Sequence, residues 1–201
     1  MVKKIKNLSP FHYFLILVIA NLALMILADI FYNGRFDFLR YPLSDLGSAF
    51  NQVGLPNTVA SNIYSVGMFL TGILLFFLAH KLRKTRQNNT SSPLLAFMGG
   101  SGALIAGASP DDTLYAFHVI GSTLLVASLW ALATMNLYEV RKNLGHAKYY
   151  FLQFAILQTP IIAYALAFFM GLKINDILQK PAFISLAFIL LYSTHAKRQT
   201  H

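Results

Sequence analysis

Long apolar runs recur along the whole chain, and they constrain its fold more than any other feature. The first reads FHYFLILVIANLALMILADIFY and covers residues 11–32. A helix needs about 20 predominantly apolar residues to cross a bilayer, and helices satisfy their own backbone hydrogen bonds in lipid. The pattern therefore predicts an all-α integral membrane bundle, one domain over residues 1–201. Its six expected spans cover about 11–32, 59–79, 93–108, 113–137, 149–170 and 177–193.

The composition supports a membrane location. Hydrophobic residues make up 56% of the chain and charged residues 11%, whereas soluble domains carry about 25% charged residues. Cysteine is absent, which excludes disulfides, thiolate zinc sites and cysteine nucleophiles. The first apolar run is longer than the roughly 7–15 residues of a signal-peptide core, so we expect it to be retained as a span.

The basic residues separate into two groups that predict the orientation. The termini and the loops after the second and fourth spans carry Lys3, Lys4, Lys6, Lys81, Arg83, Lys84, Arg86, Arg141, Lys142, Lys148, Lys197 and Arg198. The opposite side carries Arg35, Arg40, Lys173 and Lys180. Because cytoplasmic loops are enriched in Lys and Arg, both termini are expected in the cytoplasm.

This placement explains the net charge of +9 without a nucleic-acid partner. The expected partners are membrane lipids, and the expected location is the prokaryotic plasma membrane. The aspartates gather on the outer side, whereas Glu139 falls on the inner side.

Small residues follow a helical spacing in the third span. Gly99, Ala103 and Gly107 are four residues apart, and Gly102 and Ala106 form an adjacent row. Small residues at this spacing allow helix backbones to approach closely in a membrane. We expect tight packing of this span, with no ligand involved.

Three polar elements on the outer side are candidates for chemistry, since ionisable groups at membrane depth are costly. They are Asp29 near the end of the first span, the RYPLSDLGS stretch with Ser44 and Asp45, and SPDDTLYAFHVIGS over residues 109–122. From the residues alone, Asp45 is expected to form an Asx turn or a cap, with Gly47 supplying a positive φ.

The third element has structural and chemical interpretations. Asp111 or Asp112 is expected to cap the helix that follows. His118 is expected about two turns into the fourth span, roughly 9 Å deep. It is either a packed neutral side chain or a general base. No cofactor is expected, but Asp45, Asp112 and His118 form an alternative set of ligands for a divalent metal.

Two short motifs resemble a known family. YPLSDLGSAFNQVGLPN and FHVIGS are similar to motifs of the domain-of-unknown-function family 998 of bacterial and archaeal membrane proteins, and of the eukaryotic FRAG/DRAM/SFK proteins. The matching positions are Ser44, Asp45, Gly47, Pro56, His118 and Gly121. The resemblance implies a six-span bundle. Some eukaryotic members remodel the acyl chains of lipid anchors, and others have roles in autophagy or lipid organisation.

The resemblance favours a shared site formed by Asp45 and His118, and three functions remain open. The first is acyl transfer or ester hydrolysis on lipid, with His118 as base, Asp45 as its orienting group, and Ser44 or water as nucleophile. Arg40, Asp111, Asp112 and Asp29 are the substrate-binding candidates. The second is a non-catalytic lipid-binding or scaffold protein. The third is a small-solute or proton-coupled transporter that uses Asp29 and His118.

Overall fold

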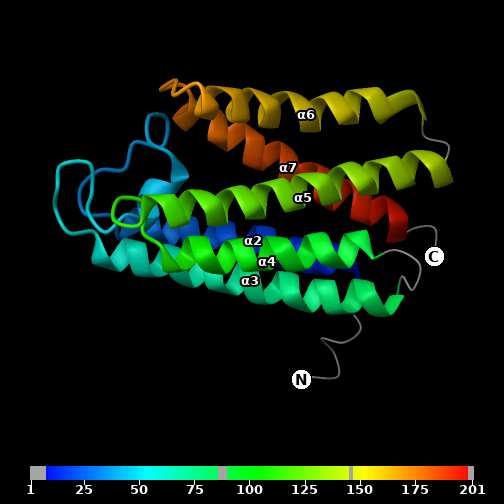
Figure 1. The fold of residues 1–201 in the computed structure, drawn as a ribbon, viewed down its shortest axis with the longest axis horizontal. Coiled ribbons are helices and arrows are strands. Elements are labelled where there is room, and N and C mark those ends of the chain that lie inside the picture. The colour runs from blue at the N-terminus through cyan, green and yellow to red at the C-terminus, as the bar shows by residue number, and fades with distance from the viewer. Residues whose placement is uncertain (1–7, 86–89, 145–146, 199–201) are drawn as a thin grey trace.

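The computed structural model describes residues 8–85, 90–144 and 147–198 and is a helical bundle (Figure 1). Its elements are α2 (Pro10–Ile30), the short 3-10 helix η1 (Leu43–Gly47), α3 (Thr58–Thr85), α4 (Ser91–Ala108), α5 (Tyr115–Leu144), α6 (Ala147–Phe169) and α7 (Asn175–Arg198). Within the described ranges, six helices are long and apolar enough to cross a membrane. The predicted six-helix membrane bundle is confirmed.

Three helices run beyond their predicted spans. α3, α5 and α7 end at Thr85, Leu144 and Arg198, past predicted ends at 79, 137 and 193. Their last turns carry basic residues, which interact favourably with the negative end of the helix dipole. Apolar composition thus marks the segment that lies in lipid, while the helix itself continues into the polar region.

The two ends of the bundle differ in charge. The start of α2 and the end of α7 lie at one end of the bundle, and η1 lies at the other (Figure 1). We call these the basic end and the η1 end. The basic end carries Lys81, Arg83, Lys84, Arg141, Lys142, Lys197 and Arg198, and the η1 end carries the six aspartates. Lys3, Lys4, Lys6, Arg86 and the side chain of Lys148 lie outside the described residues.

Backbone contacts hold α4 between α3 and α5 (Figure 1). A Cβ atom on Gly102 would lie 2.5 Å from the backbone nitrogen of Leu125, and one on Gly121 would lie 2.5 Å from that of Ala106. Such distances leave no room for a side chain on either helix. The close packing predicted for the third span is confirmed, and α5 supplies the matching glycine.

The C-terminal end of α6 has a glycine-dependent geometry. Gly171 has φ +64°, its N–H donates to the carbonyl of Phe168 at 3.1 Å, and the N–H of Leu172 donates to the carbonyl of Ala167 at 2.9 Å. These two bonds form a Schellman motif, which ends a helix and turns the chain sharply. The turn leads into α7 within a few residues and shapes the η1 end of the bundle.

Candidate functional site

The predicted Ser-Asp-x-Gly turn forms η1, which is buried against the helix ends. Ser44 and Asp45 are both buried. The Ser61 hydroxyl of α3 donates to the carbonyl of Gly47 at 2.8 Å. The N–H of Leu43 donates to Oε1 of Gln179 in α7 at 2.6 Å. The turn is therefore attached to two helices that are far apart in sequence.

Gly47 serves a different purpose from the one expected. The glycines with positive φ in the described ranges are Gly34, Gly54 and Gly171, so the predicted positive φ of Gly47 is wrong. A Cβ atom at this position would lie 2.4 Å from Cδ1 of Tyr64. Glycine is required here because the Tyr64 ring occupies the space of a side chain.

Tyr64 also contacts His118, so one ring touches both motifs. The two ring centroids are 6.5 Å apart, with 31° between the planes. Nδ1 of His118 lies 2.7 Å from the carbonyl of Ser109. A carbonyl only accepts, so Nδ1 carries a proton. His118 lies in the first turn of α5, closer to the helix start than the expected two turns.

Asp45 has its own partner, the side chain of Gln52, whose Nε2 donates to Oδ2 of the carboxylate. Across residues 8–85, 90–144 and 147–198, Asp45 and His118 share no hydrogen bond or ion pair. The structure thus brings the two motifs to the same end of the bundle and separates them by Tyr64. Their proposed catalytic roles stay a prediction.

Burial raises the pKa of Asp45 from its ordinary 3.8 to about 7. The negative charges of Asp111 and Asp176 contribute to this rise in pKa, while the hydrogen bond from Gln52 and the charge of Lys180 oppose it. Three carboxylates therefore interact at the η1 end. The charges of Asp111 and Asp176 both disfavour ionisation of Asp45.

We expect Asp45→Asn to remove a pH dependence of stability. Because the pKa is higher in the folded than in the unfolded protein, the folded state binds more protons between pH 4 and 7. The free energy of unfolding of the wild type should therefore fall as pH rises through this window. The variant should be more stable than the wild type at pH 8, with little difference at pH 4. Denaturation in detergent at both pH values measures this, and a wild-type advantage at pH 8 would contradict it.

Lys180 is a buried cation of the η1 end, and the sequence predicted only that it lies on the outer side. Its side chain is buried, and Nζ donates to the carbonyls of Tyr41 at 2.5 Å and Asp176 at 2.8 Å. Nζ also lies 5.5 Å from the centroid of the Phe38 ring. These contacts attach the loop before η1 to α7. The sequence does carry a signal for this contact, which is a lysine placed four residues after an aspartate inside an apolar helix.

The remaining candidates have separate positions. Asp112 does not cap its own helix: its two oxygens accept from the N–H groups of Ala49 at 2.9 Å and Phe50 at 2.8 Å, across the loop. Asp29 and Arg40 are exposed. Among the residues that the structure describes, no three His, Asp or Glu side chains are grouped as metal ligands.

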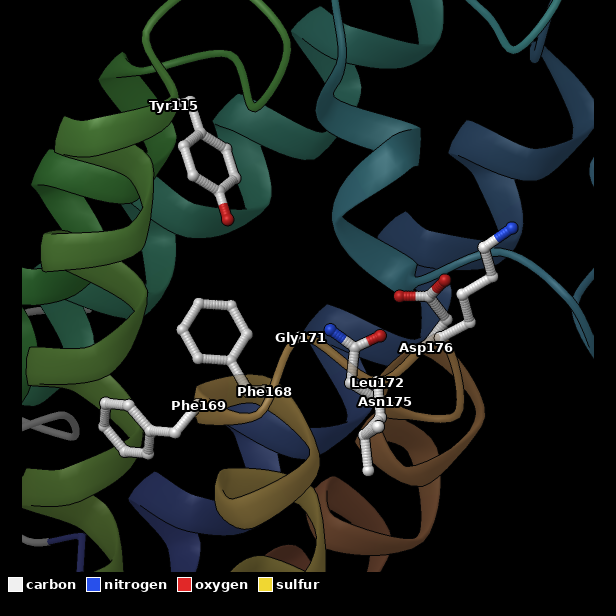
Figure 2. A pocket seen from close by; sticks show the side chains of 8 residues that line it. Tyr115, Phe168, Phe169, Gly171, Leu172, Asn175 and Asp176 are labelled. Carbon is white, nitrogen blue, oxygen red and sulfur yellow. The ribbon is translucent and has the colours of Figure 1, made fainter.

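A pocket of about 490 Å³ opens at the η1 end, between the start of α5 and the connection from α6 to α7 (Figure 2). We call it the η1-end pocket. It is lined by Tyr115, Phe168, Phe169, Gly171, Leu172, Lys173, Asn175 and Asp176. The sequence did not indicate this pocket, because its residues come from the start of α5, the end of α6, the connection that follows and the start of α7, and they form no recognisable motif.

Comparison with known proteins finds no match: no protein-family model, curated protein or solved structure is significantly similar to this chain. The resemblance of its motifs to a known family therefore stays a prediction.

Proposed function

We propose that this chain is a non-catalytic membrane protein that binds a lipid headgroup in the η1-end pocket. The main support is the composition of that pocket, in which three aromatic rings lie beside Lys173, Asn175 and Asp176. The pocket lies where the spanning helices α5, α6 and α7 begin or end, which is the depth of lipid headgroups in a bilayer. Aromatic rings with polar neighbours suit this boundary between apolar and wet surroundings.

The exposure of the pocket wall supports access from the bilayer. Phe169 is 82% exposed, although it ends a helix that is apolar enough to span a membrane. Leu172 is also exposed. A lipid can place its acyl chains against these side chains while its headgroup reaches the polar residues of the pocket.

The orientation belongs to the same proposal. The concentration of Lys and Arg at the basic end supports a cytoplasmic location of that end. The η1-end pocket then faces the outer leaflet, and the plasma membrane is the proposed location. Thiol labelling of a single engineered cysteine can measure which side of the membrane a residue faces, because the natural chain has no cysteine that would also react. Labelling of Thr113→Cys in intact cells supports this orientation, and labelling only after lysis contradicts it.

Tyr115→Ala tests lipid binding, because it removes one aromatic wall of the pocket. We expect the variant to retain several-fold less co-purified phospholipid than the wild type, measured by native mass spectrometry of the protein in detergent. Phe117→Ala is the matched control, since Phe117 is exposed on the same helix and does not line the pocket. Equal retention by both variants and the wild type would contradict the proposal.

Asp45 supports a second candidate, acyl transfer or ester hydrolysis on lipid. Its pKa of about 7 is suited to proton transfer at neutral pH. In this second candidate function, Asp45 or His118 is the general base, and Ser44 or water is the nucleophile. Reconstituted wild type should then release or transfer fatty acid from phospholipid, and folded Asp45→Asn should not. Absence of turnover by the wild type would eliminate this candidate and leave lipid binding intact.

A further inference from the structure

The η1-end pocket combines features that bear on the charge of its ligand. Figure 2 shows the rings of Tyr115 and Phe168 on one side of the space and the carboxylate of Asp176 on the other. Aromatic faces attract cations, and quaternary ammonium groups are bound by aromatic rings in this way. A carboxylate opposite the rings adds a direct charge partner.

The surroundings of the pocket reinforce a preference for a cation. Asp111 and Asp176 both lie close enough to Asp45 to raise its pKa, so three carboxylates contribute to the negative potential here. The buried Lys180 adds one positive charge at this end, which lowers the pKa of Asp45, and its amine donates to the carbonyls of Tyr41 and Asp176. It does not line the pocket.

Lys173 is the cationic residue among those that line the pocket, all of which are in the described part of the chain. It is exposed and lies in the connection between α6 and α7, two residues before α7 begins. A lysine ammonium binds phosphate as a point charge. The pocket therefore presents an anionic and aromatic part together with a cationic part.

We propose that the η1-end pocket selects zwitterionic phospholipids, with their ammonium group between Asp176 and the aromatic rings and their phosphate at Lys173. This inference rests on the proposed function, and it adds the chemical class of the headgroup. Phosphatidylethanolamine and phosphatidylcholine carry both charges, whereas phosphatidylglycerol carries the phosphate alone. The pocket should therefore distinguish lipids by the presence of the ammonium group.

The test uses the full chain in detergent, incubated with an equimolar mixture of these three phospholipids. Native mass spectrometry then measures which lipids stay bound. We expect the wild type to retain the two ammonium lipids about tenfold more than phosphatidylglycerol. Asp176→Asn should reduce this preference to near one, because it removes the charge that faces the ammonium group. Lys173→Gln should weaken the retention of all three lipids by a similar factor.

Asp37→Asn is the matched control, because it removes a carboxylate at the same end without altering the pocket. The Asp37 Oδ1 atom accepts from the N–H groups of Leu39 and Arg40, and the asparagine oxygen preserves these bonds. In Asp176→Asn, the bond from Lys180 is also preserved, since it goes to the backbone carbonyl. If that variant fails to fold, Phe168→Leu replaces it: it retains an apolar side chain, removes the ring, and should reduce the preference about threefold.

The outcomes separate the two proposals. Preference for both ammonium lipids that depends on Asp176 or Phe168 supports the inference. Equal retention of phosphatidylglycerol by the wild type overturns the headgroup assignment, while the dependence of lipid retention on Tyr115 still supports lipid binding. Retention of every lipid that is indifferent to Tyr115, Lys173 and Asp176 overturns both.

Discussion

Gly102→Ala should destabilise the bundle strongly, although it adds a single methyl group. The new Cβ atom would lie 2.5 Å from the backbone nitrogen of Leu125 and 2.6 Å from the carbonyl oxygen of Gly121. Both are backbone atoms of α5, so neither moves without shifting the helix. Overpacking of this kind costs about 1–3 kcal/mol, and more where the backbone itself must move. We expect a loss at or above the upper end of that range.

Gly99→Ala is the control in the same helix. Its Cβ atom would meet its nearest neighbours, side-chain carbons of Leu75 and Ser128, at an ordinary 3.5 Å. Alanine is also a better helix former than glycine by about 0.5–1 kcal/mol, so this variant should be neutral or slightly more stable. The single tryptophan, Trp130, donates to Gln158 of α6 at 2.8 Å, so its fluorescence reports loss of packing between α5 and α6 during denaturation. Equal stability of the two variants would contradict the packing argument.

Gly47→Ala should have the second large effect, and it acts at the η1 end. The added Cβ atom would lie 2.4 Å from Cδ1 and 2.7 Å from Cε1 of Tyr64. The Tyr64 ring cannot move freely, because it contacts His118. The turn must then leave its position, which breaks the hydrogen bonds from Ser61 and Leu43. We expect a loss of about 2–4 kcal/mol in the free energy of unfolding, together with reduced lipid retention.

A double-mutant cycle with Tyr64→Leu separates this clash from other effects of the alanine. A leucine side chain is smaller and can rotate away from the new methyl group. In the Tyr64→Leu background, Gly47→Ala should therefore cost much less than in the wild type, giving a coupling energy of about 1–3 kcal/mol. Additive losses would show that Tyr64 is not the obstacle.

The sequence predicts the bundle well because lipid imposes one simple rule. A segment of apolar residues in a bilayer must form a helix, so runs such as residues 11–32 and 149–170 identify their spans directly. The small-residue rows of the third span likewise predicted close helix packing, and the contact of Gly102 with α5 confirms it. The helix ends were less predictable, since the last turns of α3, α5 and α7 are helical and polar at once.

The η1 end is harder to predict because its contacts join residues that are distant in sequence. Nothing near Asp45 indicates that its carboxylate accepts a hydrogen bond from Gln52, or that Gln179 accepts one from the N–H of Leu43. Asp112 has the sequence pattern of a helix cap, but it holds the loop at Ala49 and Phe50 instead. Composition and spacing describe one segment at a time, whereas these bonds depend on how the segments are placed in space.

The central claim is that a lipid headgroup occupies the η1-end pocket, and photo-crosslinking tests it most directly. The full chain is reconstituted in vesicles that contain phosphatidylethanolamine whose amine carries an N-alkyl photoreactive group, which keeps the nitrogen positively charged, and the modified residues are mapped by mass spectrometry. The account predicts adducts concentrated on Tyr115 and on residues 168–176, which fall sharply in Asp176→Asn. Adducts spread evenly over the exposed face of α2, or confined to the basic end and unchanged in that variant, would contradict it.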